Sequence, residues 1–234
     1  MNLSSRNIRA IIFDLDGVIL DSMPAHVAAW QMAFKEFNLR VETNFILRHE
    51  GSMDFNLLKH CFARDGRRFE PGFFNEIYKR QREIYSNRYA ARVRVFPEAA
   101  RLLSLLSQAR VRTALVTSSR REVLSSNLWT WLKASFSALI TGDEVKRPKP
   151  HPDPYIKALA ELRLKPAEAL GVENSPAGVA SVRAADMTAV ALTTTLPPEN
   201  LMHADIVLKD HAALRRFLRR AGVINPELSS PFFI

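Results

Sequence analysis

Short apolar runs alternate with longer stretches of helical periodicity from residue 94 onward, and this alternation constrains the fold more than any other feature. The runs expected to be strands cover residues 111–116, 137–140, 169–172 and 188–192. The expected helices cover residues 97–109, about 120–132, 153–163 and 175–185. Because residues 8–13 supply one more apolar run, the pattern predicts an α/β fold. Its core is a Rossmann-like, doubly wound parallel sheet covered by helices on both faces.

Residues 23–93 show helical periodicity and no convincing strand. One face of a first helix carries Val27, Trp30, Phe34 and Phe37. Ser22 is expected to cap this helix, and Pro24 falls in its first turn. Later apolar sets at helical spacing are Phe55/Leu58/Phe62 and Phe73/Ile77/Ile84. We therefore predict an all-helical domain over residues 23–93, inserted into a core made of residues 1–22 and 94–234.

The formal net charge of +9 raises the question of nucleic-acid binding. The basic residues are scattered, with local clusters at 64–68, 119–121 and 215–220. In the last cluster, Leu214, Phe217 and Leu218 form an apolar stripe opposite the arginines, which is typical of an amphipathic helix docked on a core. We expect no nucleic-acid partner, although a basic surface attracts small anionic substrates.

The single cysteine, Cys61, excludes a disulfide within the chain, which fits a reducing compartment. It lies among apolar residues at helical spacing and is expected to be a small buried hydrophobe. The N-terminal apolar run is short and is interrupted by Asp14 and Asp16, so it predicts neither a signal peptide nor a membrane span. We expect a cytoplasmic protein that is a monomer or a weak dimer.

Two carboxylates, Asp14 and Asp16, stand where the first strand is expected to end, followed by Gly17. Residues two apart on a strand point the same way, with Cα atoms about 6.6 Å apart. One carboxylate can then attack a phosphorus atom while the other reaches the oxygen opposite, and carboxylate nucleophiles are known in phosphoryl transfer. A helix cap or a turn is the structural alternative.

Three later stretches place polar groups at or just after other strand ends, where open parallel sheets bind ligands. Thr117, Ser118 and Ser119 would form a phosphate seat, helped by the N-terminus of the following helix, or would simply cap it. Lys149 lies in a proline-rich loop; pointing inward, it would offset the repulsion between the carboxylates. Glu173 and Asn174 offer oxygen ligands that suit Mg²⁺.

Taken in this order, the four stretches resemble the signature motifs of the haloacid dehalogenase superfamily of phosphatases and phosphomutases. The likeness is to the branch with a helical cap inserted after the first motif. The residues that carry it are FDLDGVILDS, ALVTSS, RPKPHPDPY and VENSPAGVASVRAADM, and the resemblance covers roughly residues 8–210. Four motifs in order at fitting spacings are far more specific than one.

The resemblance implies a catalytic role for four residues. Asp14 would be the nucleophile that forms an aspartyl-phosphate, and Asp16 the general acid and then the base. Thr117 would hydrogen-bond the phosphoryl group, and Lys149 would hold that group and the nucleophile. Mg²⁺ would be bound by Asp14, the backbone carbonyl of Asp16 and residue 174, with Glu173 in support.

Two positions depart from the family pattern. Residue 174 is Asn where the family more often has Asp; an amide oxygen still coordinates Mg²⁺, but the site loses a formal charge. Residue 186 is Asp where glycine is usual, and Asp is among the residues that best tolerate such a turn. The first departure bears on the metal and leaves the reaction class unchanged.

The segment DSMPAHVAAW resembles that of β-phosphoglucomutase-like members, in which a histidine at the position of His26 helps control the acid/base aspartate. His26 is therefore a candidate substrate-site residue, or else a helix residue near the hinge of the cap. HEGSMDFNLL lacks the basic residue that sugar-phosphate mutases place after the glycine at 51. Hydrolysis of a small phosphomonoester, of sugar-phosphate or phosphoglycolate type, is the first expectation. A mutase and a non-catalytic binding protein stay open, and a dehalogenase is disfavoured because it would not need Asp16.

Overall fold

The computed structural model describes residues 7–50, 52, 59, 62–63 and 71–228. Its centre is a six-stranded parallel sheet with the order β3-β2-β1-β4-β5-β6. The strands are β1 (Ala10–Asp14), β2 (Arg112–Val116), β3 (Ala138–Ile140), β4 (Ala169–Glu173), β5 (Thr188–Leu192) and β6 (Ile206–Leu208). The predicted α/β class and parallel sheet are confirmed. The edge strand β6 was not predicted, because three half-buried residues are too short to show a period.

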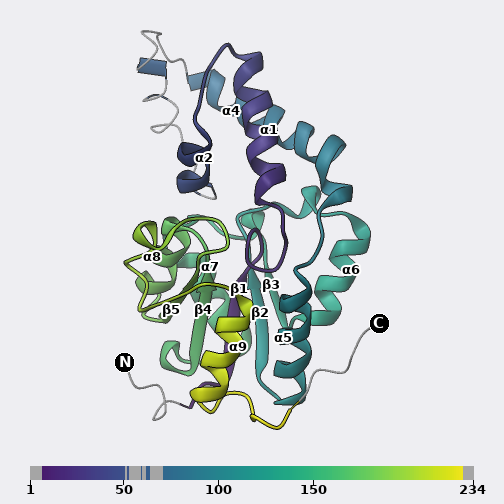
Figure 1. The fold of residues 1–234 in the computed structure, drawn as a ribbon. Coiled ribbons are helices and arrows are strands. Elements are labelled where there is room, and N and C mark those ends of the chain that lie inside the picture. The colour runs from purple at the N-terminus through teal and green to yellow at the C-terminus, as the bar shows by residue number, and fades with distance from the viewer. Residues whose placement is uncertain (1–6, 51, 53–58, 60–61, 64–70, 229–234) are drawn as a thin grey trace.

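Helices cover both faces of the sheet. One face packs against α5 (Pro97–Gln108), α6 (Ser126–Ser135) and α9 (His211–Arg220), and the other against α7 (Asp153–Leu162) and α8 (Pro176–Ala184) (Figure 1). Alternate residues of β1 serve the two faces: Ile11 and Phe13 join the first core, and Ala10 and Ile12 the second. As predicted, α9 is amphipathic, with Leu214 and Leu218 buried.

The helix after β2 begins later than predicted. It starts at Ser126, where Ser125 caps it by accepting a hydrogen bond from the Leu128 amide, and only a short 3₁₀ turn (Arg121–Val123) precedes it. Six residues therefore separate Ser119 from the start of α6. The prediction that the N-terminus of this helix assists the Thr117–Ser119 segment is wrong.

The chain between β1 and α5 forms a separate helical layer, which we call the cap. It contains α1 (Met23–Glu36), α2 (Thr43–His49) and α4 (Pro71–Ile84), followed by a π-helical turn (Tyr85–Tyr89) and a 3₁₀ turn (Ala90–Arg92). Among the residues described in this region none is in a strand. Figure 1 shows the cap standing over the carboxyl ends of the strands.

The cap has a hydrophobic core of its own. Trp30, Phe34, Ile46 and Ile77 are buried in it, and Val27 and Phe37 pack against it at its edge. The stripe predicted on the first helix therefore faces this core. Phe55, Leu58 and Cys61 lie outside the described residues, and the domain boundaries at residues 22 and 93 stay a prediction.

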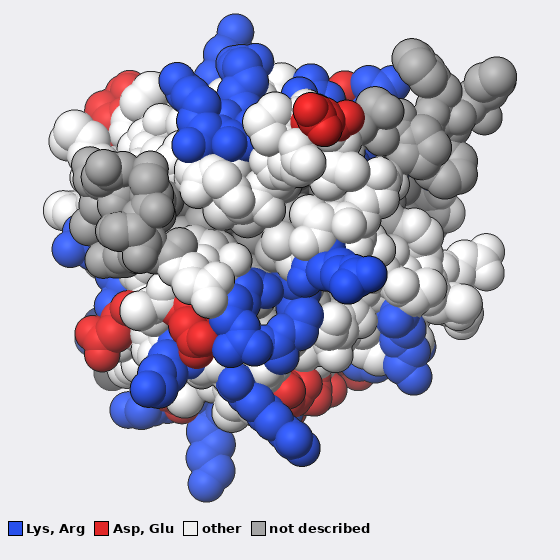
Figure 2. Space-filling model, turned by 90° about the horizontal axis from the view of Figure 1, so that it is seen from below, with Lys and Arg blue, Asp and Glu red and all other residues white. Residues whose placement is uncertain are grey.

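The end of the core opposite the cap is rich in basic side chains. Figure 2 shows Lys and Arg there in several groups, separated by uncharged and acidic side chains. That face carries no single continuous basic stripe of the kind that tracks a nucleic-acid backbone. In the described part of the chain, no helix combines the length and the apolar character needed to cross a membrane.

Candidate active site

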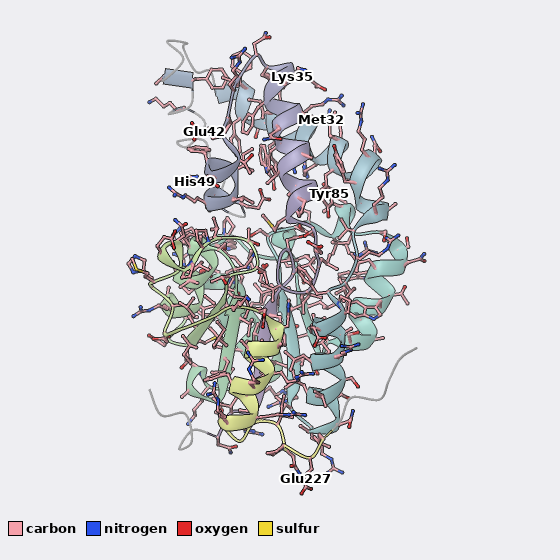
Figure 3. The ribbon with its side chains drawn as sticks, in the orientation of Figure 1. Met32, Lys35, Glu42, His49, Tyr85 and Glu227 are labelled. Carbon is pink, nitrogen blue, oxygen red and sulfur yellow. The ribbon has the colours of Figure 1, made fainter. Side chains whose placement is uncertain are left out.

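A pocket of about 440 Å³ lies between the carboxyl ends of β1, β2 and β4 and the cap. Most of the predicted site residues meet in it. Those on its wall are Asp14, Asp16, His26, Ser118, Lys149 and Asn174. Figure 3 places Tyr85, another residue of this wall, at the end of the cap nearest the core. Residues up to 160 positions apart in sequence thus share one cavity because parallel strands end at the same edge.

Asp14 and Lys149 form a buried ion pair. The Lys149 Nζ lies 2.6 Å from Asp14 Oδ1 and also donates to the Val116 carbonyl. Burial raises the pKa of Asp14, and the charges of Glu173 and Asp16 raise it too, whereas the Lys149 ammonium opposes them and favours the carboxylate. A carboxylate in this position gains from any further positive charge that the pocket can hold.

Glu173 lies behind Lys149 and not on the pocket wall. It is fully buried, and its Oε1 accepts from Lys149 Nζ at 2.6 Å and from the Tyr155 hydroxyl at 2.7 Å. Its Oε2 accepts hydrogen bonds from the Asn174 backbone N–H and the Ser175 hydroxyl. With both oxygens occupied in this way, Glu173 does not fit the predicted place among the metal ligands. Its contacts instead fix the ammonium group of Lys149.

Asp16 accepts hydrogen bonds from three side chains. Its Oδ1 lies 2.6 Å from the Ser22 hydroxyl and 3.1 Å from His26 Nε2, and its Oδ2 lies 2.9 Å from the Ser119 hydroxyl. Burial raises the pKa of Asp16, but the His26 charge and these hydrogen bonds outweigh it and bring the pKa down to about 2. The predicted capping of α1 by Ser22 is wrong, because its hydroxyl turns to Asp16.

His26 joins the cap to the acid/base candidate. Its ring stacks on Tyr85 with centroids 4.1 Å apart, and its Nδ1 lies 3.6 Å from Glu50 Oε1. Burial alone would lower the pKa of His26, but the negative charges of Asp16 and Glu50 have the larger effect and raise it to about 9. The protonated form of His26 is therefore favoured at neutral pH, with Nε2 donating a hydrogen bond to Asp16 Oδ1.

The hydroxyl segment after β2 is divided between two roles. Thr117 is buried and accepts a hydrogen bond from the Ser119 amide at its Oγ1, which shapes the turn, while its side chain is not on the pocket wall. Ser118 and Ser119 do line the pocket. The Ser118 backbone lies close to Gly142: a Cβ on residue 142 would lie 2.3 Å from the Ser118 carbonyl oxygen. This segment is thus held tightly beside Asp16.

The residues predicted to hold Mg²⁺ supply hard oxygen donors, which suit that ion. Asp14, Asp16 and Asn174 border the same pocket. The Asn174 Nδ2 donates to Thr195 Oγ1 at 2.7 Å, so the amide oxygen is the atom left for a cation. Gly17 makes room for this amide: it has a φ of 84°, and a Cβ there would lie 2.1 Å from Asn174 Nδ2.

The donor set carries little charge. Among the described residues no group of three or more His, Cys, Asp or Glu side chains is arranged around a metal position. One carboxylate, one backbone carbonyl and one amide oxygen fit an ion that also takes waters and substrate oxygens, as Mg²⁺ does. The buried Asp14 carboxylate, with its raised pKa, is the feature that such an ion would stabilise.

Several residues of the site, or the contacts they make, were not singled out from sequence. Ser119 was predicted as part of the phosphate seat but not as a partner of Asp16. Tyr155 is the last residue of the proline-rich motif, so it had a signal nearby. Ser22 was noticed but assigned to a helix cap. Glu50 follows the last residue of α2 in the cap, and Thr195 lies in the loop after β5. The local sequence at these two positions has no pattern that indicates a functional site.

Comparison with known proteins places this geometry in a family. A sequence profile described as haloacid dehalogenase-like hydrolase matches residues 11–192. Validoxylamine A 7'-phosphate phosphatase of Streptomyces hygroscopicus subsp. limoneus is 29% identical over 208 residues, covering 88% of this chain and 96% of the relative. Hexitol phosphatase A of Escherichia coli is 30% identical over 200 residues, covering 86% and 90%.

The similarity extends to a mutase and to solved structures. Beta-phosphoglucomutase of Bacillus subtilis is 25% identical over 211 residues, covering 88% of this chain and 92% of the relative. The crystal structure of a hydrolase from Pseudomonas syringae superposes with a TM-score of 0.79 at 23% identity, covering 91% and 98%, which supports the fold. The profile match spans most of the chain, and the parallel sheet and its ordered motifs agree with it. The chain is therefore an enzyme of the haloacid dehalogenase-like hydrolase family.

Proposed function

We propose that the protein hydrolyses small phosphomonoesters of sugar-phosphate type with Mg²⁺, through an aspartyl-phosphate on Asp14. The observation that carries this proposal is the Asp14–Lys149 pair at 2.6 Å on the wall of a pocket that also holds Asp16 and Asn174. An anionic nucleophile beside a fixed ammonium is the arrangement that phosphoryl transfer needs. The phosphatases among the relatives support the same reaction class.

In the first step an Asp14 oxygen attacks the phosphorus, and the ester oxygen of the substrate leaves. Lys149 compensates the charge on Asp14 and binds a phosphoryl oxygen, and its own position is fixed by Glu173. The Ser118 backbone and hydroxyl are placed to hydrogen-bond the phosphoryl group. The resemblance assigns such a bond to Thr117 as well, although its side chain lies behind the wall.

Asp16 and His26 transfer the protons in the two steps. The departing oxygen needs a proton, and the ionised Asp16 can obtain one from His26 Nε2, 3.1 Å away. In the second step Asp16 takes a proton from the water that hydrolyses the aspartyl-phosphate. Ser22 and Ser119 orient the Asp16 carboxylate during both steps. We thus infer that His26 acts as the partner of the acid/base aspartate.

Asp14, the Asp16 carbonyl and the Asn174 amide oxygen would hold Mg²⁺, which supplies positive charge to the phosphoryl oxygens. With Asn in place of Asp at residue 174, this site has one negative charge fewer, so we expect it to bind the metal more weakly. Glu173 cannot make up the charge by direct coordination because its oxygens are occupied. Its negative charge instead acts from behind Lys149.

Phosphate release tests the proposal. We would measure inorganic phosphate released from hexose phosphates, hexitol phosphates, glycerol phosphate and phosphoglycolate, with Mg²⁺ and with EDTA. The Asp14→Asn variant serves as the blank, because it keeps the size of the side chain and removes the nucleophile. Metal-dependent release by the parent protein alone supports the proposal. Equal release by the Asp14→Asn variant contradicts it.

A sugar-phosphate mutase is the second candidate, favoured by the similarity to beta-phosphoglucomutase. In a mutase the phosphoenzyme must outlive attack by water, so phosphate release would be slow and a bisphosphate would accelerate isomer interconversion. Ser52, Met53 and Asp54 follow Gly51, where sugar-phosphate mutases place a basic residue, and this difference favours hydrolysis. A protein without turnover that still binds phosphate would instead be a non-catalytic member of the family.

A further inference from the structure

The cap contributes a carboxylate, a carboxamide and aromatic rings to the pocket wall. The Glu50 carboxylate and the Gln81 carboxamide lie in this wall beside His26, Ser52 and Arg82, and its rings are Trp30, Tyr78 and Tyr85. This wall faces the carboxyl ends of the strands, where the phosphoryl group would be bound. The part of the substrate that meets it is therefore the leaving group.

Glu50 is held in place but keeps accepting capacity. Its Oε2 accepts a hydrogen bond from Trp30 Nε1 at 2.8 Å. Its Oε1 lies 3.6 Å from His26 Nδ1, too far for a hydrogen bond, and that buried nitrogen has no hydrogen-bond partner in the described structure. The Glu50 side chain is 18% exposed, so water screens its charge poorly.

Gln81 is more deeply buried than Glu50 and is not paired. It is 4% exposed, lies on α4 and borders the pocket. Its carboxamide makes no hydrogen bond with any residue that the structure describes. Because Gln81 borders the pocket, its carboxamide is available to donate and accept hydrogen bonds with a ligand there.

Two described arginines near this wall pair with a carboxylate. Arg82 and Arg120 also border the pocket, but Arg82 NH1 bonds Glu122 at 2.6 Å and Arg120 Nε lies 3.5 Å from the same carboxylate. The positive charge of His26 is directed to Asp16 at 3.1 Å. Glu122 thus offsets part of the charge of the two arginines, although the buried Arg82 Nε has no hydrogen-bond partner in the described structure. Glu50 lies in the wall itself and would repel an anionic leaving group.

We propose that Glu50 and Gln81 select phosphomonoesters whose leaving group is uncharged and rich in hydroxyl groups, and reject those that carry a carboxylate. Hydroxyl groups donate to Glu50 Oε1 and exchange hydrogen bonds with Gln81, while the rings of Trp30 and Tyr85 pack against the carbon skeleton. This inference rests on the proposed function and narrows it, because it removes phosphoglycolate-like acids from the expected substrates.

Two substrates of the same skeleton test the selection. Glycerol 3-phosphate and 3-phosphoglycerate differ by a hydroxymethyl group in place of a carboxylate. We expect the parent enzyme to prefer glycerol 3-phosphate in kcat/KM by about 10- to 100-fold, the scale of a like-charge contact in a poorly solvated site. In Glu50→Gln, which removes the charge and keeps the shape, that ratio should fall about tenfold or more.

A matched control is available in the same domain. Glu42 is an exposed cap glutamate at the end of α2 away from the core, so Glu42→Gln makes the same charge change outside the pocket (Figure 3). Its substrate ratio should equal that of the parent. Gln81→Met provides a second variant; we expect it to raise KM for glycerol 3-phosphate about tenfold, through loss of a buried hydrogen bond.

Hydrolysis of p-nitrophenyl phosphate, which lacks the hydroxyl groups, separates the two levels of the proposal. If the parent and Glu50→Gln both release phosphate from it, and Glu50→Gln keeps the parental ratio between the two three-carbon substrates, the inference about Glu50 is overturned while the proposed function stands. If the parent with Mg²⁺ releases phosphate from none of the three, the proposed function fails and takes the inference with it.

Discussion

Lys149 is expected to stabilise the fold as well as the reaction. Its ammonium is 4% exposed and lies 2.6 Å from each of two carboxylates, Asp14 and the fully buried Glu173. Replacing it by Met fills the same space and leaves these carboxylates without a counter-charge. Breaking a buried ion pair by removing one partner costs about 3–5 kcal/mol, and we expect Lys149→Met to lower the free energy of unfolding by that amount.

For a chain of this length, a loss of that size lowers Tm by about 6–20 °C. The assay is thermal and urea unfolding followed by circular dichroism, in EDTA so that no bound cation contributes. Lys157→Met is the matched control: Lys157 also has two carboxylate partners, Glu144 at 3.1 Å and Glu161 at 3.8 Å, but its side chain is 35% exposed. We expect that control to cost less than about 1 kcal/mol.

The effect of Lys149→Met should also depend on pH. Burial raises the pKa of Asp14 and the Lys149 ammonium lowers it, so without Lys149 this pKa rises further. The variant then takes up a proton at a higher pH than the parent, and its deficit shrinks as the pH falls. Equal destabilisation by Lys149→Met and Lys157→Met, or a Lys149→Met deficit that does not change with pH, would refute the buried-charge reasoning.

Three further predictions concern the reacting groups. Asp14→Asn should abolish phosphate release while the far-ultraviolet circular dichroism stays parental; activity in this variant would remove the nucleophile assignment. Asn174→Asp should lower the Mg²⁺ concentration for half-maximal activity severalfold, because it restores a negative charge; an unchanged titration would mean that residue 174 does not touch the metal. His26→Gln should cost about 2–3 kcal/mol of stability, the size of the linked pKa shifts. That cost should be largest between pH 4 and 6.5, and it should fade as the pH rises toward 9, where His26 loses its proton, or falls toward 2, where Asp16 gains one. Urea unfolding across this range would contradict the assignment if the cost were the same at every pH.

Much of the fold could be predicted from sequence because its elements have clear local signals. The strands around β1 are fully buried, so they read as continuous apolar runs, and helices such as α5 show an unbroken apolar face. The start of α6 was missed because the segment after Ser119 contains arginines that suit either a helix or a loop. Only the Ser125 cap, a tertiary outcome of how the loop returns, fixes the boundary.

The site could be predicted as far as its motifs reach. Asp14, Asp16, Lys149 and Asn174 follow strand ends, and parallel topology brings strand ends together. The role of Ser22 could not be predicted, because a helix N-cap and a partner for Asp16 need the same residue type at the same place. The backbone conformation of Asp186 could be predicted, because a left-handed turn is expected at a position where glycine is usual, and its φ is 58°.

The cap residues are the part that sequence could not supply. Glu50 and Gln81 line the same pocket as His26 only because α2 and α4 pack against α1 above the sheet, and no spacing within one element encodes that arrangement. Substrate recognition depends on such contacts between elements, whereas the phosphoryl-transfer groups depend on strand ends.

The central claim is that Asp14 carries the phosphoryl group. Cleavage after Arg9 and Lys35 would release residues 10–35, which contain Asp14, Asp16 and Asp21. We would mix enzyme, Mg²⁺ and a hexitol phosphate, quench in acid within one turnover, and locate any added phosphoryl group on this peptide by mass spectrometry. The account predicts modification at Asp14 in the parent and none in Asp14→Asn. Turnover that leaves this peptide unmodified at every quench time, or modification at Asp16 or Asp21, would contradict it.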